Sequence, residues 1–306
     1  MKKPFYKKIW FWLVILLVIG GAGAASTKKK DKQEITSVET GSDTKISIDS
    51  GDSVNDQNKS TDPSIDSMLL FDEAGIKCTA NGISNDTIMG YGVDISLESS
   101  ADKNYTIQCK ATTVNDYMIF DLFSCELAPG KKANDTIYLS SSELEAAGIT
   151  NIGKIELYFV IIDSETFMRE YELDPVTIKT SYYDQMDSSV DISGKTLYDE
   201  NGIKIIGKYV NEDNFWGTGV CLYIENNTDK EMVITAEDVS VNGYMIDGHL
   251  YCDIYPGKKA VDEISFFSRD LENNGITSVD EVELNFKFMD SDYNISKTES
   301  IKFSTK

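Results

Sequence analysis

Apolar residues stand at every second position in short stretches from about residue 68 to the C-terminus. Val93, Ile95 and Leu97 form one such stretch, and Val220 and Leu222 belong to another. A period of two places these side chains on one face of a β-strand. In the C-terminal part of the chain the pattern predicts seven strands, at Gly202–Gly207, Thr218–Asn226, Glu231–Val241, His249–Tyr255, Ala260–Phe267, Glu281–Met289 and Glu299–Ser304. Helical patterns are limited to single turns at Ser142–Ala147 and Asp270–Asn274, closed by Gly148 and Gly275.

The strand pattern occurs twice because the sequence itself is repeated. FDEAGIK at 71–77 matches YDENGIK at 198–204, VNDYM at 114–118 matches VNGYM at 241–245, and PGKKA follows both residue 128 and residue 255. Each of these pairs is 127 residues apart. The spacing shortens by two only at the last strand, where TIKT at 177–180 answers KFST at 302–305. The chain is therefore a tandem duplication.

From these patterns we predict an all-β fold of two tandem seven-stranded immunoglobulin-like β-sandwiches, preceded by a transmembrane helix and a disordered stalk. Residues 26–67 are rich in Ser, Thr, Asp and Lys and contain almost no aromatic residues. Such a segment cannot bury enough apolar surface to offset its ordering entropy. The predicted divisions are a cytoplasmic tail (1–8), a transmembrane signal anchor (9–25), a flexible stalk (26–67), the first repeat (68–180), a linker (181–196) and the second repeat (197–306).

The N-terminal segment carries four lysines before an apolar run from Ile9 to Ala25. Its 17 residues approach the length that crosses the hydrocarbon core of a bilayer. A retained signal anchor is the interpretation we favour, because the apolar run continues without a polar break. A cleaved signal peptide is the alternative, with Ala22-Gly23-Ala24 offering small residues for cleavage. The short basic tail indicates a single-pass protein of the cell membrane whose C-terminal body is extracytoplasmic.

Both copies, with their YDENGIK entry, VNGYM hairpin and PGKKA turn, resemble the Ig-like domains of unknown function found in membrane-anchored or secreted proteins of Gram-positive bacteria. The KKPFYKKIWFW start is similar to the anchor of those proteins. The resemblance covers nearly the whole chain and implies fold and location. It carries over no functional residue, because the shared motifs are turns and core positions.

Charge separates the two ends of the chain. The net charge is −22, and residues 1–32 contribute +7, so the remaining residues carry −29. A body this acidic repels phosphate backbones, and we therefore expect no nucleic-acid partner. The expected partners are the membrane, through the N-terminal helix, and a surface or envelope protein.

Carboxylates form one candidate metal site. Asp290, Asp292 and Asn294 stand at alternate positions on a predicted loop, and Asp163 and Glu165 stand on its counterpart. Oxygen ligands at this spacing could hold Ca²⁺. The glycine and glutamate of an EF-hand loop are missing at the expected spacing, and we favour solvated hairpin residues and predict no metal.

Two further groups are candidate binding residues. Phe215 and Trp216 precede a strand of the second copy, where they could stack on sugar rings or close the end of the sandwich core. Tyr158, Val160 and Ile162 occupy outward positions of a strand whose counterpart is polar. An apolar stripe on the outer face of a sheet indicates a contact, either with the second copy or with a partner, unless it is a modest exposed patch.

The cysteines and the single histidine do not form a recognisable catalytic or metal-binding pattern. Among the five cysteines only Cys125 and Cys252 are equivalent by the repeat spacing, so we expect no disulfide framework. We predict four buried cysteines and a surface thiol at Cys221, where the first copy has Asp94. The single histidine, His249, is expected to be an ordinary surface residue, and no phosphate-binding loop or nucleophile motif occurs.

The sequence thus predicts a membrane-anchored extracytoplasmic binding or structural protein, without catalytic residues or cofactor, whose ligand the sequence does not identify. An accessory or sensor subunit of an envelope complex is the alternative, and its short cytoplasmic tail would require a membrane partner. Cleavage of the N-terminal segment would instead give a secreted binding module.

Overall fold

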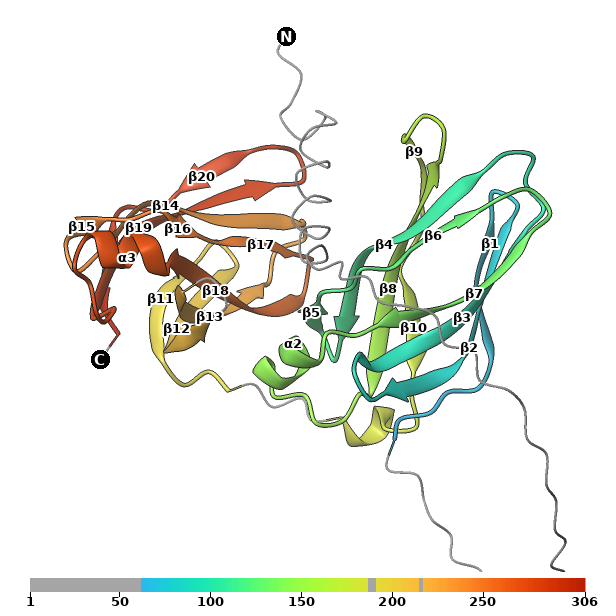
Figure 1. Ribbon diagram of the computed structural model, residues 1–306, viewed down its shortest axis with the longest axis horizontal. Helices are drawn as coiled ribbons and strands as arrows, with labels where there is room; N and C mark the ends of the chain where they lie inside the picture. The colour runs from blue at the N-terminus through green and yellow to red at the C-terminus, as the bar shows by residue number, and fades with distance from the viewer. Residues whose placement is uncertain (1–61, 187–190, 215–216, 306) are drawn as a thin grey trace, which may run out of the picture. The chain divides into compact units, whose positions relative to one another are not determined.

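The computed structural model describes residues 62–186, 191–214 and 217–305. Its elements all belong to one compact unit, Asn58–Lys306, and nearly all of them are β-strands (Figure 1). The helices in the described ranges are two single-turn α-helices, α2 (Ser141–Ala146) and α3 (Ser268–Asn273), and the 3₁₀ turn η2 (Tyr183–Gln185). The prediction of an all-β fold with one helical turn per copy is confirmed.

The first copy contains ten strands in two sheets. They are β1 (Met68–Glu73), β2 (Ile76–Asp86), β3 (Gly90–Ser99), β4 (Tyr105–Val114), β5 (Tyr117–Ile119), β6 (Ser124–Leu127), β7 (Lys132–Tyr138), β8 (Lys154–Asp163), β9 (Arg169–Glu172) and β10 (Val176–Lys179). One sheet has the order β1-β2-β3-β7 (Figure 1). The other has the order β10-β8-β4-β5, with β6 on β4 and β9 on β8.

The second copy repeats this plan. Its strands are β11 (Lys195–Glu200), β12 (Ile203–Asn214), β13 (Gly217–Asn226), β14 (Met232–Val241), β15 (Tyr244–Met245), β16 (Gly248–His249), β17 (Tyr251–Ile254), β18 (Lys258–Phe267), β19 (Glu281–Asp290), β20 (Ile295–Lys297) and β21 (Ile301–Ser304). The order β11-β12-β13-β18 matches the first sheet of the first copy. The order β15-β14-β19-β20, with β17 on β14 and β21 on β19, matches the second sheet.

Each copy buries its own core between its two sheets. Alternate residues of β3 and β8, such as Ile95 and Leu157, meet in the first core, where the ring of Phe71 lies 4.9 Å from that of Phe159. Alternate residues of β13 and β19, such as Leu222 and Phe286, meet in the second. The period-two patterns in the sequence therefore face inward as predicted.

The repeated motifs form the tight turns. In the VN-x-YM motif, Asn115 and Asp116 have φ values of +50° and +69°, and Asn242 and Gly243 have +52° and +84°. Positive φ at both central residues is the geometry of the two-residue hairpins that join β4 to β5 and β14 to β15. The sequence analysis named VNGYM as a hairpin, and the structure has it in both copies.

In each copy the asparagine of this motif also connects its hairpin to the start of a neighbouring strand, β8 or β19, by hydrogen bonds. The Oδ1 atom of Asn115 accepts hydrogen bonds from the backbone N–H groups of Gly153 and Lys154 at 2.9 and 3.0 Å. The Oδ1 atom of Asn242 accepts the corresponding bonds from Asp280 and Glu281, both at 3.0 Å. Bonds that satisfy buried backbone donors explain why the asparagine is present twice.

The structure also departs from the prediction at element boundaries. The prediction of seven strands per copy is too low, because the first copy has ten and the second has eleven. It omitted the first strand of each copy, β1 or β11, and the short strands β15 and β20, and β11 begins two residues inside the predicted linker. Residues 62–67 belonged to the predicted stalk, but Pro63 is buried and Ile65 packs against the first core. The Tyr91 hydroxyl donates to Asp62 at 2.8 Å, so the end of the stalk is fixed to the sandwich.

The predicted tail (1–8), anchor (9–25) and most of the stalk lie outside the described residues. No helix within residues 62–186, 191–214 and 217–305 has the length and hydropathy required to span a membrane.

Candidate functional site

The candidate calcium ligands of the second copy bind a lysine of the same copy. The ammonium group of Lys230 lies 2.8 Å from Oδ2 of Asp290 and 2.7 Å from Oδ2 of Asp292. In the first copy the equivalent Lys103 lies 2.7 Å from both Asp163 and Glu170. Glu165 does not join this pair. A lysine ammonium thus occupies, in both copies, the position that a cation would take.

The aspartates have a second role in the turns. The Oδ1 atom of Asp290 accepts the backbone N–H groups of Asp292 and Asn294, both at 2.9 Å, and Asp163 accepts those of Glu165 and Thr166. The hydrogen bond from Lys230 holds the pKa of Asp290 well below its usual range, and Lys103 does the same for Asp163. Among the residues described, no group of three His, Cys, Asp or Glu side chains could hold a metal.

The aromatic candidates Phe215 and Trp216 lie outside the described residues. Their counterparts in the first copy, Ile88 and Met89, are exposed.

Tyr158, the first residue of the outward stripe on β8, lies against the second copy. The ring of Tyr158 is 4.7 Å from that of Tyr255, and Val160 is only 2% exposed. Ile162 is half-buried. The contact between Tyr158 and Tyr255 belongs to a larger interface between the copies, which we call the joint.

An ionic cluster forms the polar part of the joint. The Nζ atom of Lys258 is 2.8 Å from Oδ1 of Asp116 and also pairs with Glu156. Lys154 reaches the same Asp116 oxygen at 2.6 Å. Burial lowers the pKa of Lys258, but the bonds to Asp116 and Glu156 outweigh this effect and its pKa is raised. Lys258 therefore remains charged although it is buried.

An apolar contact and a strand pairing complete the joint. Ile206 and Tyr223, on the outer face of the β12–β13 sheet, belong to the core cluster of the first copy, and Met118 packs against that of the second. Tyr117 of β5 pairs in parallel with Lys259 of β18. The backbone N–H of Lys259 donates to the Asp116 carbonyl at 2.9 Å.

The two copies contribute different faces to the joint, because the residues at equivalent positions differ between them. The first copy has Thr79 and Ser96 where the second has Ile206 and Tyr223. The second copy has Asn285 and Lys287 where the first has Tyr158 and Val160, and it has Gly243 in place of Asp116. The outer face that is apolar in one copy is therefore polar at the equivalent positions of the other.

The joint also explains why one cysteine prediction is wrong. Cys221 was expected at the surface but is 2% exposed. It lies on the same face of β13 as Tyr223, and this outer face is covered. Cys78 and Cys252 are buried as predicted, whereas Cys109 and Cys125 are half-buried, and all five thiols are free.

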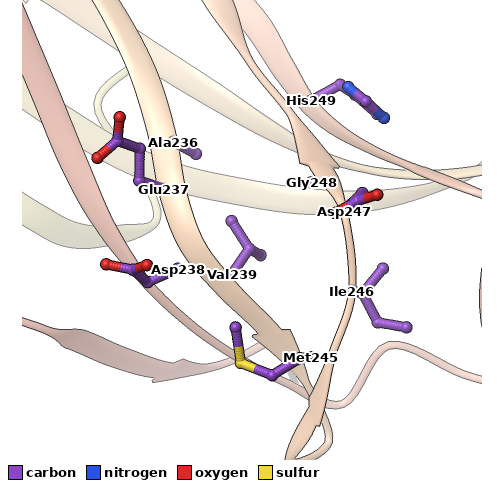
Figure 2. Close-up of a pocket in the computed structure, with 9 residues that line it drawn as sticks. All are labelled: Ala236, Glu237, Asp238, Val239, Met245, Ile246, Asp247, Gly248 and His249. Atoms are coloured by element: carbon purple, nitrogen blue, oxygen red, sulfur yellow. The ribbon is translucent and has the colours of Figure 1, made fainter.

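A hollow of about 480 Å³ lies beside β14 in the second copy (Figure 2). Figure 2 shows Glu237 and Asp238 on one side, Asp247 and His249 on the other, and Val239 between them. Glu237 pairs with Lys287 at 2.7 Å, and Lys297 pairs with both acids, so their charge is already compensated. His249 is exposed as predicted, with its ring 4.7 Å from that of Phe267. The arrangement places polar groups at the surface of the second copy.

In the first copy, the loop equivalent to residues 247–249 borders a different hollow, of about 380 Å³. Phe120, Asp121 and Leu122 here correspond to Asp247, Gly248 and His249. Three exposed apolar side chains line it, Met89 (50%), Phe120 (59%) and Leu122 (69%). Together with Ile88, which precedes Met89 and is 88% exposed, we call them the apolar end.

Sequence reasoning missed the apolar end. Its signal was the replacement of Asp-Gly-His at 247–249 by Phe-Asp-Leu at 120–122 in the aligned repeats. Clustered exposed apolar side chains of this kind usually mark a contact surface.

No known protein family matches the sequence. No curated protein matches it either.

Solved structures show faint likeness. The Salmonella enterica SafA pilin in complex with the SafB chaperone is 12% identical, with a TM-score of 0.20 over 70% of this chain and 88% of that one. The CsuC–CsuE chaperone–tip adhesion subunit complex of Acinetobacter baumannii is 12% identical, with a TM-score of 0.21 over 69% and 90%. A Porphyromonas gingivalis protein of unknown function is 9% identical, with a TM-score of 0.19 over 69% and 90%. Values this low carry no inference about function.

Proposed function

We propose that this chain is a membrane-anchored extracytoplasmic binding protein, non-catalytic, in which two immunoglobulin-like sandwiches joined as one unit present the apolar end to a partner. The membrane part of the proposal rests on the N-terminal sequence. The binding part rests on the structure of the first copy.

The observation that carries the binding function is the apolar end. Phe120 and Leu122 are 59% and 69% exposed and line a hollow of about 380 Å³. The equivalent connection of the second copy carries Asp247 and His249, so the fold itself does not require apolar residues there. Apolar side chains that the fold does not require, and that weaken solubility, are best explained by a partner that covers them.

The joint supports the same function. Because Lys258 and Tyr255 of the second copy are buried against the first, the two sandwiches offer a partner a preformed surface. Preformed surfaces lose less conformational entropy on binding than flexibly linked domains do.

The test uses the full-length chain in the cells that produce it. A photo-cross-linking amino acid replaces Leu122 in one variant and, as a matched control, the equivalent His249 in another. Protease is added to half of each intact-cell sample, and the N-terminus of the membrane-bound protein is determined by mass spectrometry.

We expect the membrane-bound protein to retain Met1 and its C-terminal body to be digested by protease added to intact cells. The cross-linker at position 122 should give one defined adduct, and the cross-linker at position 249 should not give it. Protection of the body in intact cells would contradict the topology. Equal or absent adducts at both positions would contradict the binding site. A chain that begins near Ala25 and is found in the medium would make it a secreted module.

A further inference from the structure

Two carboxyl groups of the second copy lie where it meets the first. Asp253 is on β17, and its side chain points away from the core that Cys252 and Ile254 enter. Tyr255, two residues further along, packs on Tyr158 of the first copy. Asp262 is on β18, the strand that pairs with β5 of the first copy.

Asp253 has an incomplete set of polar contacts. The cation that acts on it is Lys110 of β4, which already pairs at 2.8 Å with Glu172 and at 2.8 Å with Glu231. One ammonium group thus faces three carboxyl groups. The Oδ1 atom of Asp253 is buried without a hydrogen-bond partner among the described residues. A buried carboxylate in this situation is costly, whereas its protonated form is not.

The raised pKa of Asp253 is consistent with its burial and its missing hydrogen bond. Burial and the charge of Glu231 raise its pKa to about 6, although Lys110 acts in the opposite direction. The other titratable groups whose charges interact with it are Tyr251, Cys252 and Tyr255.

The carboxylate of Glu143, on α2 of the first copy, acts on Asp262 across the joint. The Oδ1 atom of Asp262 accepts the backbone N–H of Glu263 at 2.7 Å. Burial raises its pKa to about 7, and the charges of Glu143 on α2 of the first copy and of Glu263 add to this effect. The thiols of Cys252 and Cys221 are the other titratable groups around it.

We propose that the joint is a pH-responsive contact, which holds the two copies more tightly in mildly acid solution than above neutral pH. Protonation of Asp253 and Asp262 removes two negative charges from an interface rich in carboxylates. The proton also allows Asp253 to act as a donor. The proposal does not depend on the binding function of the apolar end.

The direction in which pH changes the stability of the joint follows from the shifted pKa values of the two aspartates. Both aspartates hold their protons to a higher pH in the joined state than in the unfolded chain. Their contribution is therefore fully present below the ordinary aspartate pKa of 3.8 and is lost as pH rises through about 6 and about 7. Asp116 behaves oppositely: despite burial, its bonds to Lys154 and Lys258 lower its pKa, so this ion pair weakens only in more acid solution. The joint should be tightest between about pH 4.5 and 6.

The experiment follows the joint in the full-length chain by hydrogen exchange. The reporter is the amide of Lys259, which donates to Asp116, and the reference is the β3 peptide within the first core. Protection factors, which remove the intrinsic pH dependence of exchange, are compared at pH 5.5 and 8.0. The variants are Asp253→Asn with Asp262→Asn, and the matched control is Glu126→Gln with Asp135→Asn at the equivalent exposed positions of the first copy.

The wild type should lose about 3- to 30-fold in protection at Lys259 between pH 5.5 and 8.0, with little change in β3. Between these two pH values a carboxyl group with a pKa of about 6 allows about 4-fold and one with a pKa of about 7 allows about 30-fold, and partial exposure reduces both. The Asn pair should abolish the change and the control pair should keep it. Equal protection at both pH values in the wild type would overturn the proposal, even if the Asn variant failed to fold. A pH dependence that survives in the folded Asn variant would overturn it as well.

Discussion

The Nζ atom of Lys258 lies 2.8 Å from the Oδ1 atom of Asp116, and this ion pair joins the second copy of the repeat to the first. Both residues belong to turns that occur twice in the chain, the PGKKA turn and the VN-x-YM hairpin. Asp116 adopts φ +69° at the position where the other hairpin has Gly243. A non-glycine residue at positive φ is strained, so its retention is explained by the two lysines that it binds.

Replacing Lys258 by Met should lower the free energy of unfolding by about 1–3 kcal/mol, because Asp116 and Glu156 would lose a buried cation. Urea denaturation measures this. The control is Lys131→Met, the equivalent and exposed lysine of the first copy, which should change stability by less than about 0.5 kcal/mol. Equal effects of the two variants would show that the ion pair does not stabilise the joint.

Val160→Lys should destabilise the protein by about 2–4 kcal/mol, because it places a charge where the side chain is now 2% exposed. The reverse exchange at the equivalent position, Lys287→Val, removes only a partly exposed pair with Glu237 and should cost less than about 1 kcal/mol. Thermal unfolding of both variants tests the difference. A tolerated lysine at 160 would mean that the outer face of β8 is open to solvent.

Calcium should leave the melting temperature unchanged, because Lys230 already neutralises Asp290 and Asp292. The same carboxylates should make the protein sensitive to acid. The lowered pKa values of Asp290 and Asp163 mean that their contribution is present above the ordinary aspartate pKa and is lost as pH falls below it. A calcium-dependent rise in melting temperature that disappears in Asp290→Asn would contradict this account of the turn.

The native thiols should react slowly with iodoacetamide at pH 8, and Cys221 should be protected like Cys78. Burial raises the pKa of Cys221, and burial with the influence of Cys125 raises that of Cys78 to about 12. Cys125, which is half-buried, should be modified first. Peptide mass spectrometry gives the order of modification. Early modification of Cys221 would show that the outer face of β13 is uncovered.

The repeat made much of the fold predictable. The 127-residue spacing aligns β3 with β13, β4 with β14 and β8 with β19, and it locates the hairpins at Asn115 and Asn242. The first strands were missed because β1 and β11 are short and mostly exposed, so alternation is weak there. Edge strands of this kind are specified by pairing with their neighbour rather than by their own pattern.

The site was harder to predict, because it depends on which outer faces are covered. The apolar stripe at Tyr158 was visible in the sequence, but Tyr223 and Cys221 were not recognised as part of a covered face. Lys103 and Lys230 were visible as equivalent lysines, yet their pairing with Asp163 and Asp290 links residues 60 positions apart. Alternation assigns a residue to a face of its strand and does not show what packs on that face.

The central claim is that the two copies form one unit through the joint, and a disulfide across it is the most direct test. Tyr117 and Lys259 are bridge partners of β5 and β18, and neighbouring strands place Cα atoms within the range that a disulfide spans. The matched control uses the equivalent residues of the opposite copies: Lys132→Cys on β7 is equivalent to position 259, and Tyr244→Cys on β15 is equivalent to position 117. These two strands do not pair with each other.

Mild oxidation of the full-length chain, followed by peptide mass spectrometry, should link the cysteines of Tyr117→Cys/Lys259→Cys within one chain and leave those of Lys132→Cys/Tyr244→Cys unlinked. Equal linkage in both pairs, or none in the first, would contradict the joint and with it the account of this protein as a single two-copy unit.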